Sequence, residues 1–151
     1  MKNEHNNFGI GKTHLQIVLS KRLIKQGFNV LDISDVTFMD EMMNAKRMDD
    51  NGETYYKMYE SVLKADVLVW DDIGKTKANE AKESLYYNII NECYKQRKPI
   101  VFNNNEDRGT LSERIGNVAQ SRLIGTCYDS EVVKDYLLET EGTDWRLKKN
   151  A

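Results

Sequence analysis

Apolar runs and one-sided helical patterns alternate along the chain and predict a regular series of strands and helices. Short apolar runs of the kind found in buried strands occur at residues 29–33, 67–70 and 100–102, and a last strand is expected within 132–138. Helical periodicity predicts helices at residues 12–26, 34–47, 53–64, 78–97 and 112–123. Strands that alternate with helices predict a single α/β domain over residues 1–151, with a mostly parallel sheet covered on both faces.

The boundaries of the expected helices carry residues that favour helix ends. Ser34 stands at the N-cap position of the second helix, and Gly27 follows the first. Pro99, the only proline, follows the longest helix and cannot continue it. In the first expected helix, one face carries Leu15, Val18, Leu19, Arg22 and Leu23.

Composition excludes a few classes of protein. Hydrophobic residues form 40% of the 151 residues and charged residues 30%, which indicates one globular domain rather than a disordered chain. The net charge of −2 gives no global signal for nucleic-acid binding, so any DNA contact is expected to be local. The sequence shows no apolar run long enough to span a membrane and no signal-peptide pattern, and we expect a cytoplasmic protein. Cys93 and Cys127 are expected to be reduced, buried thiols.

A phosphate-binding motif precedes the first expected helix. The pattern G-x-x-x-x-G-K-[ST] holds phosphates with backbone N–H groups, a lysine that reaches the β- and γ-phosphates, and a hydroxyl that holds Mg²⁺. This chain has Asn6 at the motif's first glycine position. The residues expected to bind nucleotide are Gly9, Ile10, Gly11, Lys12, Thr13 and His14. The alternative is that Lys12 is an ordinary solvated lysine at the start of a helix.

The strand that ordinarily precedes such a loop is not predicted from this sequence. Residues 1–7 contain no β-branched or aromatic residue and include three asparagines, a composition that disfavours a strand. We therefore expect these residues to be a polar start that is disordered or a remnant, and the sheet to lack its first strand. The edges of neighbouring strands are then expected to be exposed.

Polar residues follow two of the expected strands. Asp71 and Asp72 end the strand at 67–70, where Asp71 is expected to hold Mg²⁺ and Asp72 to polarise the attacking water as a general base. Asn103–Asn105 follow the next strand, and a neutral amide there can orient that water; motif spacing favours Asn105. The alternatives are that the acids form a helix cap or loop and that the asparagines form a simple turn.

Arginines near the end of the chain are candidates for stabilising charge in the transition state of phosphoryl transfer. Phosphoryl transfer spreads negative charge over the γ-phosphate oxygens, and a positioned guanidinium that stabilises this charge accelerates such reactions by about 10³–10⁵-fold. Arg122 and Arg146 are the candidates, with Arg108 and Arg114 as nearby competitors. From chemistry alone, any one arginine is more often a surface residue.

Taken together, these segments resemble a known family. The order GIGKTHL, VLVWDDIG, PIVFNNN, LSERIGNVAQSRLIGTC and EGTDWRLKK is similar to the DnaC/DnaI-type loaders of bacterial replicative helicases, which are AAA+ P-loop ATPases. The resemblance implies a three-layer AAA+ core. It makes Lys12 and Thr13 Walker A residues, Asp71 and Asp72 the Walker B pair, and Asn105 the first sensor. Arg122 matches the arginine finger, which acts on a neighbouring subunit's ATP, and Arg146 the second sensor.

The resemblance also implies ligands and partners. These are ATP with Mg²⁺, a replicative hexameric DNA helicase, single-stranded DNA, and self-association in an ATP-dependent oligomer. Family loaders usually carry a separate N-terminal segment that grips the helicase, and the sequence is expected to lack it, as if cut just upstream of the phosphate loop. Two alternatives stay open: a transposition-helper ATPase with the same core motifs, and a degenerate, non-catalytic module that binds helicase or loader subunits.

Overall fold

Three parallel strands form the centre of the molecule. The computed structural model describes residues 9–129, 134–138 and 140. The strands β1 (Val30–Ser34), β2 (Val67–Asp71) and β3 (Ile100–Phe102) pair in the order β1-β2-β3. The registers Ser34–Asp71 and Trp70–Phe102 bring the carboxyl ends of the strands to one edge of the sheet. The predicted α/β fold with a parallel sheet is thereby confirmed.

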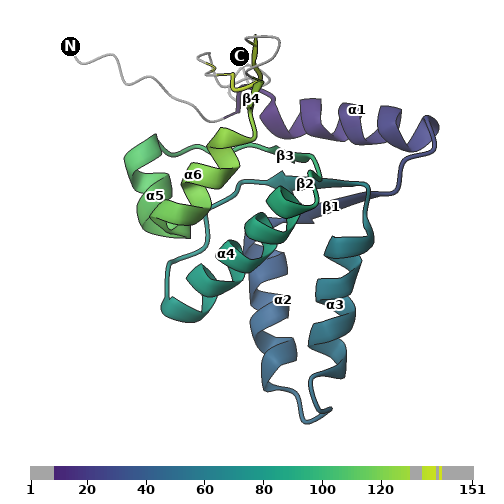
Figure 1. Ribbon diagram of the computed structural model, residues 1–151, viewed down its shortest axis with the longest axis vertical. Coiled ribbons are helices and arrows are strands. Elements are labelled where there is room, and N and C mark those ends of the chain that lie inside the picture. The colour runs from purple at the N-terminus through teal and green to yellow at the C-terminus, as the bar shows by residue number, and fades with distance from the viewer. Residues whose placement is uncertain (1–8, 130–133, 139, 141–151) are drawn as a thin grey trace, which may run out of the picture.

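Helices connect the strands and cover the sheet (Figure 1). In that view α1 lies above the strands, and α2, α3 and α4 lie below them. The predicted helix at 53–64 agrees with the structure to the residue, and the helix predicted at 78–97 is shorter by two residues at each end. The six helices of the described residues are α1 (Lys12–Lys25), α2 (Asp35–Arg47), α3 (Glu53–Lys64), α4 (Glu80–Lys95), α5 (Arg108–Ile115) and α6 (Asn117–Gly125).

Strand β2 is buried on both of its faces. Leu68 and Trp70 belong to the main core, where the Trp70 ring stacks on Tyr86 of α4 with centroids 5.6 Å apart and meets Phe38 of α2 edge to face. Val67 and Val69 alternate with them and are also buried. A strand buried on both faces explains why residues 67–70 form an unbroken apolar run instead of an alternating pattern.

The prediction of one helix over residues 112–123 is wrong. Helix α5 ends at Ile115 and α6 begins at Asn117, with Gly116 between them at φ 91° and ψ 146°. Residues with a side chain rarely adopt this backbone conformation, so a glycine is needed at the break. A Cβ at this position would also lie 2.8 Å from Glu83 Oε1 on α4, so the α5–α6 corner packs closely on α4.

The last predicted strand is only partly present in the described residues. Strand β5 (Lys134–Asp135) pairs antiparallel with β4 (Tyr128–Asp129), a strand that the sequence pattern did not predict. This two-stranded ladder is separate from the parallel sheet. Residues 132 and 133 of the predicted range 132–138 lie outside the described residues. Residues 1–7, which include Asn6, also lie outside them.

The apolar face predicted for the first helix does not face the described core. Leu15 is 67% exposed and Val18 51%, whereas the buried residues of α1 are the polar Gln16 and Ser20. Ser20 Oγ donates to Asp32 of β1, and the Gln16 amide lies at the end of β2. Helix α1 therefore contacts the described strands mainly through polar side chains.

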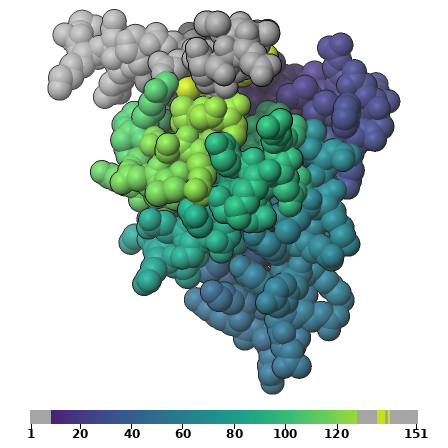
Figure 2. All heavy atoms as spheres, in the orientation of Figure 1, coloured from purple at the N-terminus to yellow at the C-terminus, as the bar shows by residue number. Residues whose placement is uncertain are grey.

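Helices α2 and α3 form a hairpin that projects from the rest of the molecule, at the lower end of Figure 2. Lys98 anchors the C-terminal end of α3, because its ammonium donates to the carbonyl oxygens of Val62 and Leu63. A cation at these carbonyls satisfies acceptors that the helix leaves unpaired. No helix within the described ranges is long and apolar enough to cross a membrane.

Candidate functional site

The candidate site lies where the start of α1 meets the carboxyl ends of β2 and β3. Gly9 and Gly11 have φ angles of 67° and 93°, in the left-handed region that favours glycine. This conformation bends the backbone immediately before α1, so Lys12 is the first helical residue. The N–H groups of the first turn and the positive dipole end of α1 are thus located beside the strand ends.

Thr13 and Asp71 lie together at this edge. Thr13 Oγ1 donates to Asp71 Oδ1 at 2.9 Å, although the two residues are far apart in the sequence. A hydroxyl and a carboxylate oxygen at this separation are hard oxygen ligands of the type that Mg²⁺ prefers when phosphates supply further ligands. The pair therefore fits a Mg²⁺ ion bound together with a nucleotide.

Lys12, Asn105 and Asp72 form a chain of hydrogen bonds. Lys12 Nζ donates to the Asn104 carbonyl at 2.8 Å and to Asn105 Oδ1 at 2.5 Å, and Asn105 Nδ2 donates to Asp72 Oδ1 at 2.9 Å. Burial lowers the pKa of Lys12 from its ordinary value, and the negative charge of Asp72 opposes that shift. The amide of Asn105 thus lies between the ammonium and the carboxylate.

Asp72 has an unusual backbone for a residue with a side chain. Its φ is 54°, in the left-handed region, directly after the extended residues of β2. The next residues are held in place because Ile73 N donates to the Asn103 carbonyl at 2.9 Å. Lys75 Nζ pairs with Asp72 Oδ2 at 3.1 Å. Backbone strain of this kind concentrates at functional sites, where surrounding contacts maintain it.

Asn103 is a site residue that the sequence prediction passed over. Its buried amide contacts both acids: Nδ2 donates to Asp71 Oδ1 at 2.7 Å, and Oδ1 accepts from Asp72 N at 3.0 Å. Gln16 of α1 lies against the same amide. The run of three asparagines was the available signal, but spacing alone does not separate the residue that holds the acids from the one that reaches Lys12.

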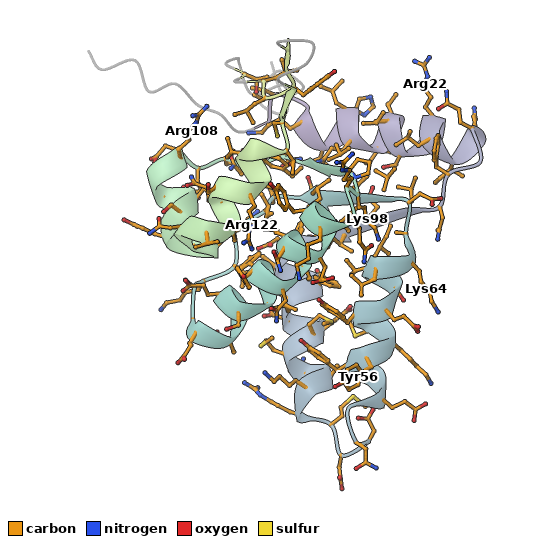
Figure 3. All side chains as sticks on the ribbon, in the orientation of Figure 1. Arg22, Tyr56, Lys64, Lys98, Arg108 and Arg122 are labelled. Carbon is orange, nitrogen blue, oxygen red and sulfur yellow. The ribbon has the colours of Figure 1, made fainter. Side chains whose placement is uncertain are left out.

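Arg122 lies on a different part of the molecule (Figure 3). It belongs to α6, and its contacts are on α4: Nη1 donates to Asn91 Oδ1, and Cζ lies 5.2 Å and 6.0 Å from the ring centroids of Tyr87 and Tyr94. Residues 87, 91 and 94 follow helical spacing and so share one face of α4. The structure does not bring Arg122 to Lys12 or Asp72 of the same chain.

The other predicted residues have simpler positions. Ile10 lies half-buried in the loop between the two glycines, and His14 is exposed on the first turn of α1. Arg146 lies outside the described residues. Of the competitors, Arg114 is in the last turn of α5 and Arg108 begins that helix.

A cavity of about 750 Å³ lies apart from this cluster, between the C-terminal half of α2 and the start of α4. Its cationic lining residues are Lys46, Arg47 and Lys82, and Lys82 pairs with Asp40 at 3.0 Å. The cavity shares no residue with the cluster around Lys12. The acids Asp40 and Glu80 line it as well, so the lining is mixed in charge.

A glycine-containing loop at the start of a helix, beside strands that end in acidic and amide side chains, defines a P-loop nucleotide-binding protein of the AAA+ class. The family described as IstB-like ATP binding protein matches residues 6–151, and the chain belongs to this family.

Individual relatives come from replication and from insertion sequences. The chain is 28% identical to the chromosomal replication initiator protein DnaA of Thermoanaerobacter sp. (strain X514) over 74% of its own length, which is 25% of that protein. It is 26% identical to the insertion sequence IS21 putative ATP-binding protein of Pseudomonas aeruginosa over 93% of its own length, which is 50% of that protein. The chain therefore spans a quarter to a half of these relatives.

Solved structures agree with the fold. A crystal structure of the DnaC helicase loader superposes with a TM-score of 0.65 at 26% identity, covering 79% of this chain and 70% of that one. AMPPCP-bound DnaA from Aquifex aeolicus superposes with a TM-score of 0.68 at 23% identity, covering 78% of this chain and 36% of that one. The resemblance to DnaC-type AAA+ proteins predicted from the sequence is confirmed.

Proposed function

We propose that this chain is the ATP-binding and ATP-hydrolysing module of a loader for a replicative DNA helicase, with a role at the start of DNA replication. The observation that carries the proposal is the connected network in which α1 supplies Lys12 and Thr13, β2 supplies Asp71 and Asp72, and β3 leads to Asn105. The structural similarity to the DnaC helicase loader supports the choice of partner.

Each residue of the network has a role in phosphoryl transfer to water. Lys12 binds the β- and γ-phosphates, while Thr13 and Asp71 hold Mg²⁺, which neutralises charge on the phosphate oxygens when bound. Asp72 accepts a proton from the attacking water, and Asn105 orients that water. Asn105 donates to Asp72, so one amide connects the base with the lysine that senses phosphate.

Assembly of subunits completes the proposed site. Arg122 makes its described contacts on the outer side of α4 rather than with Asp72, and this position suits a guanidinium that acts on the nucleotide of a neighbouring subunit. Arg146 is proposed as the second sensor from the resemblance alone. ATP binding then favours an oligomer, and hydrolysis releases it.

Single-stranded DNA is proposed to bind in the cavity between α2 and α4. Lys46 and Arg47 are exposed at the end of α2, and Lys82 lies across from them at the start of α4. Cations on both sides of the cavity attract a phosphate backbone. Asp40, which pairs with Lys82, and Glu80 in the same lining oppose that attraction, as does the net charge of −2. A structure of the initiator DnaA bound to AMPPCP and single-stranded DNA shares the fold.

Transposition is the second candidate function. The IS21 ATP-binding protein of Pseudomonas aeruginosa aligns with 93% of this chain, a larger share than the DnaA relatives reach. In this alternative the same site hydrolyses ATP, and the partner is a transposase instead of a helicase. Binding assays with each purified partner separate the two, because only one of them should bind in an ATP-dependent way.

ATP turnover with matched variants tests the proposed chemistry. Lys12→Ala is expected to abolish nucleotide binding, and Asp72→Asn to preserve binding but abolish turnover. Lys21→Ala is the control, since Lys21 is an exposed lysine of the same helix. Binding without turnover in the unmodified chain would contradict the ATPase proposal and favour a non-catalytic interaction module.

Arg122→Ala tests the proposed assembly. The variant is expected to bind ATP normally but to hydrolyse it only when mixed with a subunit that supplies an intact Arg122. Because Asp72→Asn retains Arg122, mixing these two inactive variants should restore part of the activity. Loss of ATP binding in Arg122→Ala, or no recovery on mixing, would contradict the assignment.

A further inference from the structure

A buried carboxylate outside the predicted site lies directly behind the two acids. Asp35 is the first residue of α2, and its side chain has no exposed surface. Its Oδ1 accepts from Trp70 Nε1 at 2.9 Å, and its Oδ2 accepts from Thr76 N at 2.8 Å. The Tyr86 hydroxyl lies 2.7 Å from both oxygens and donates between them.

These partners enclose the segment that carries the acids. Trp70 immediately precedes Asp71, and Thr76 lies in the loop that follows Asp72. Asp35 itself follows Ser34, which is paired in register with Asp71. One carboxylate thus connects both ends of the segment 70–76, while the stacked Tyr86 ring fixes the same indole from α4.

We propose that Asp35 is a positioning residue for the Mg²⁺–nucleotide site, which holds segment 70–76 so that Asp71 and Asp72 face Thr13 and Lys12. It acts through Trp70 and Thr76 and does not itself contact the reacting groups. This inference rests on the proposed function, because it assigns a role in the same ATP site.

The geometry requires a side chain that only accepts hydrogen bonds. The Trp70 indole and the Thr76 backbone N–H can only donate, and they approach different oxygens of Asp35. An asparagine of the same shape would direct its NH₂ group at one of these two donors. Tyr86 cannot remove the conflict, since its hydroxyl can reorient but the other two donors cannot.

Asp35→Asn must therefore release either the end of β2 or the loop after Asp72. The replacement is nearly isosteric, so the packing of Phe38, Trp70 and Tyr86 is retained. Misplacing Asp71 should weaken Mg²⁺ binding, and misplacing Asp72 should slow proton removal from water. Losses at residues that orient metal ligands are typically about tenfold to hundredfold in metal affinity or activity.

The experiment compares Asp35→Asn with Glu41→Gln, which removes an exposed carboxylate from the same helix. Tyr86→Phe is a milder second variant, because it removes the hydroxyl and keeps the ring. For each variant, turnover and its Mg²⁺ dependence are measured well below the unfolding temperature, together with the affinity for an ATP analogue without Mg²⁺. The NMR resonance of the Trp70 indole N–H, in a Trp145→Phe background, reports the hydrogen bond without turnover.

The proposal predicts a specific combination of results. Asp35→Asn should lower kcat and the apparent Mg²⁺ affinity by about tenfold or more, shift the Trp70 indole resonance, and leave Mg²⁺-free analogue binding unchanged. Tyr86→Phe should change the same quantities in the same direction by less, and Glu41→Gln should change none. A lower unfolding temperature with unchanged kcat and Mg²⁺ dependence would overturn the proposal, because a merely structural residue gives that result.

The failure of the proposed function gives a different result. If the unmodified chain does not hydrolyse ATP, or Asp72→Asn turns over normally, the ATPase assignment fails irrespective of Asp35. In that case Mg²⁺-dependent analogue binding and the indole resonance still decide the inference. Unchanged Mg²⁺ dependence of analogue binding in a folded Asp35→Asn chain would overturn the inference. If Asp35→Asn does not fold, Tyr86→Phe decides it: an unchanged Mg²⁺ dependence together with an unchanged Trp70 indole resonance in that variant would overturn the inference.

Discussion

Replacing Asn103 by alanine removes the side chain that connects the two acids at the end of β2. The amide is buried, and besides its contact with Gln16 it makes one hydrogen bond to the Asp71 carboxylate and one with the backbone N–H of Asp72. Alanine fills neither position, so the Asp72 backbone N–H loses its partner and Asp71 Oδ1 loses one of its donors. Asp71 keeps its bond from Thr13, which limits the loss.

The two bonds set the expected magnitude. A hydrogen bond to a charged group contributes about 1.5–3 kcal/mol to stability, and a neutral one about 0.5–1.5 kcal/mol. Because Thr13 still donates to Asp71, we take the lower part of both ranges and expect a loss of about 2–3 kcal/mol. That is a large fraction of the ~5–15 kcal/mol by which domains of this size are stable.

Equilibrium urea unfolding followed by circular dichroism measures this loss. Asn104→Ala is the matched control, because Asn104 contacts Lys12 through its backbone carbonyl, which the substitution keeps. Asn103→Ala should have a lower midpoint with an unchanged slope, and it should also bind Mg²⁺–nucleotide more weakly. A difference between the two variants below about 0.5 kcal/mol would refute the claim that Asn103 holds the acids.

Three further predictions concern α4 and its neighbours. Replacing Tyr87 and Tyr94 together by leucine should reduce ATP turnover by about fivefold through loss of the cation–π contacts that orient Arg122, and phenylalanine at both positions should restore it. Burial raises the pKa of the Cys93 thiol to about 11. The native chain should therefore react with Ellman's reagent at Cys93 only slowly at pH 8, and rapidly once it is unfolded in denaturant. A rapid reaction of the native chain at Cys93 would contradict the burial of this thiol. Gly116→Ala should destabilise the fold by about 1–3 kcal/mol in urea unfolding, whereas Gly125→Ala, which has space around it, should not.

Stability at alkaline pH depends on the same thiol. The folded-state pKa of Cys93 lies above its ordinary value of 9.0, so the folded chain holds this proton more tightly than the unfolded chain does. The contribution to stability is therefore complete below pH 9 and is lost as the pH rises through about 11. A Cys93→Ala chain should lose less stability over that interval in otherwise identical unfolding experiments.

Elements with strong local signals were predictable from the sequence. Helix α3 combines a turn at residues 49–52 with clear helical periodicity, and β2 is an unbroken apolar run that ends in acids. Both were predicted with bounds close to those observed. Thr13 and Asp71 were each predicted as Mg²⁺ ligands from motif chemistry, and the hydrogen bond between them is a contact that the sequence did not specify.

The misses depend on contacts between distant segments. The break at Gly116 is favoured because α5 and α6 both pack near α4, while helical periodicity continues across it. The polar buried face of α1 depends on partners on β1 and β2, such as Asp32, which no local pattern reveals. Asp35 had the appearance of an ordinary residue at a helix start, and only the fold brings Trp70 and Tyr86 to it.

Calorimetric titration of the chain with a Mg²⁺-bound, non-hydrolysable ATP analogue tests the central claim most directly. Micromolar binding is expected for the unmodified chain; it should disappear in Lys12→Ala, persist in the control Lys21→Ala and weaken in Asn103→Ala. A folded, monodisperse chain that binds no analogue, or binds it equally well without Lys12, would contradict the account.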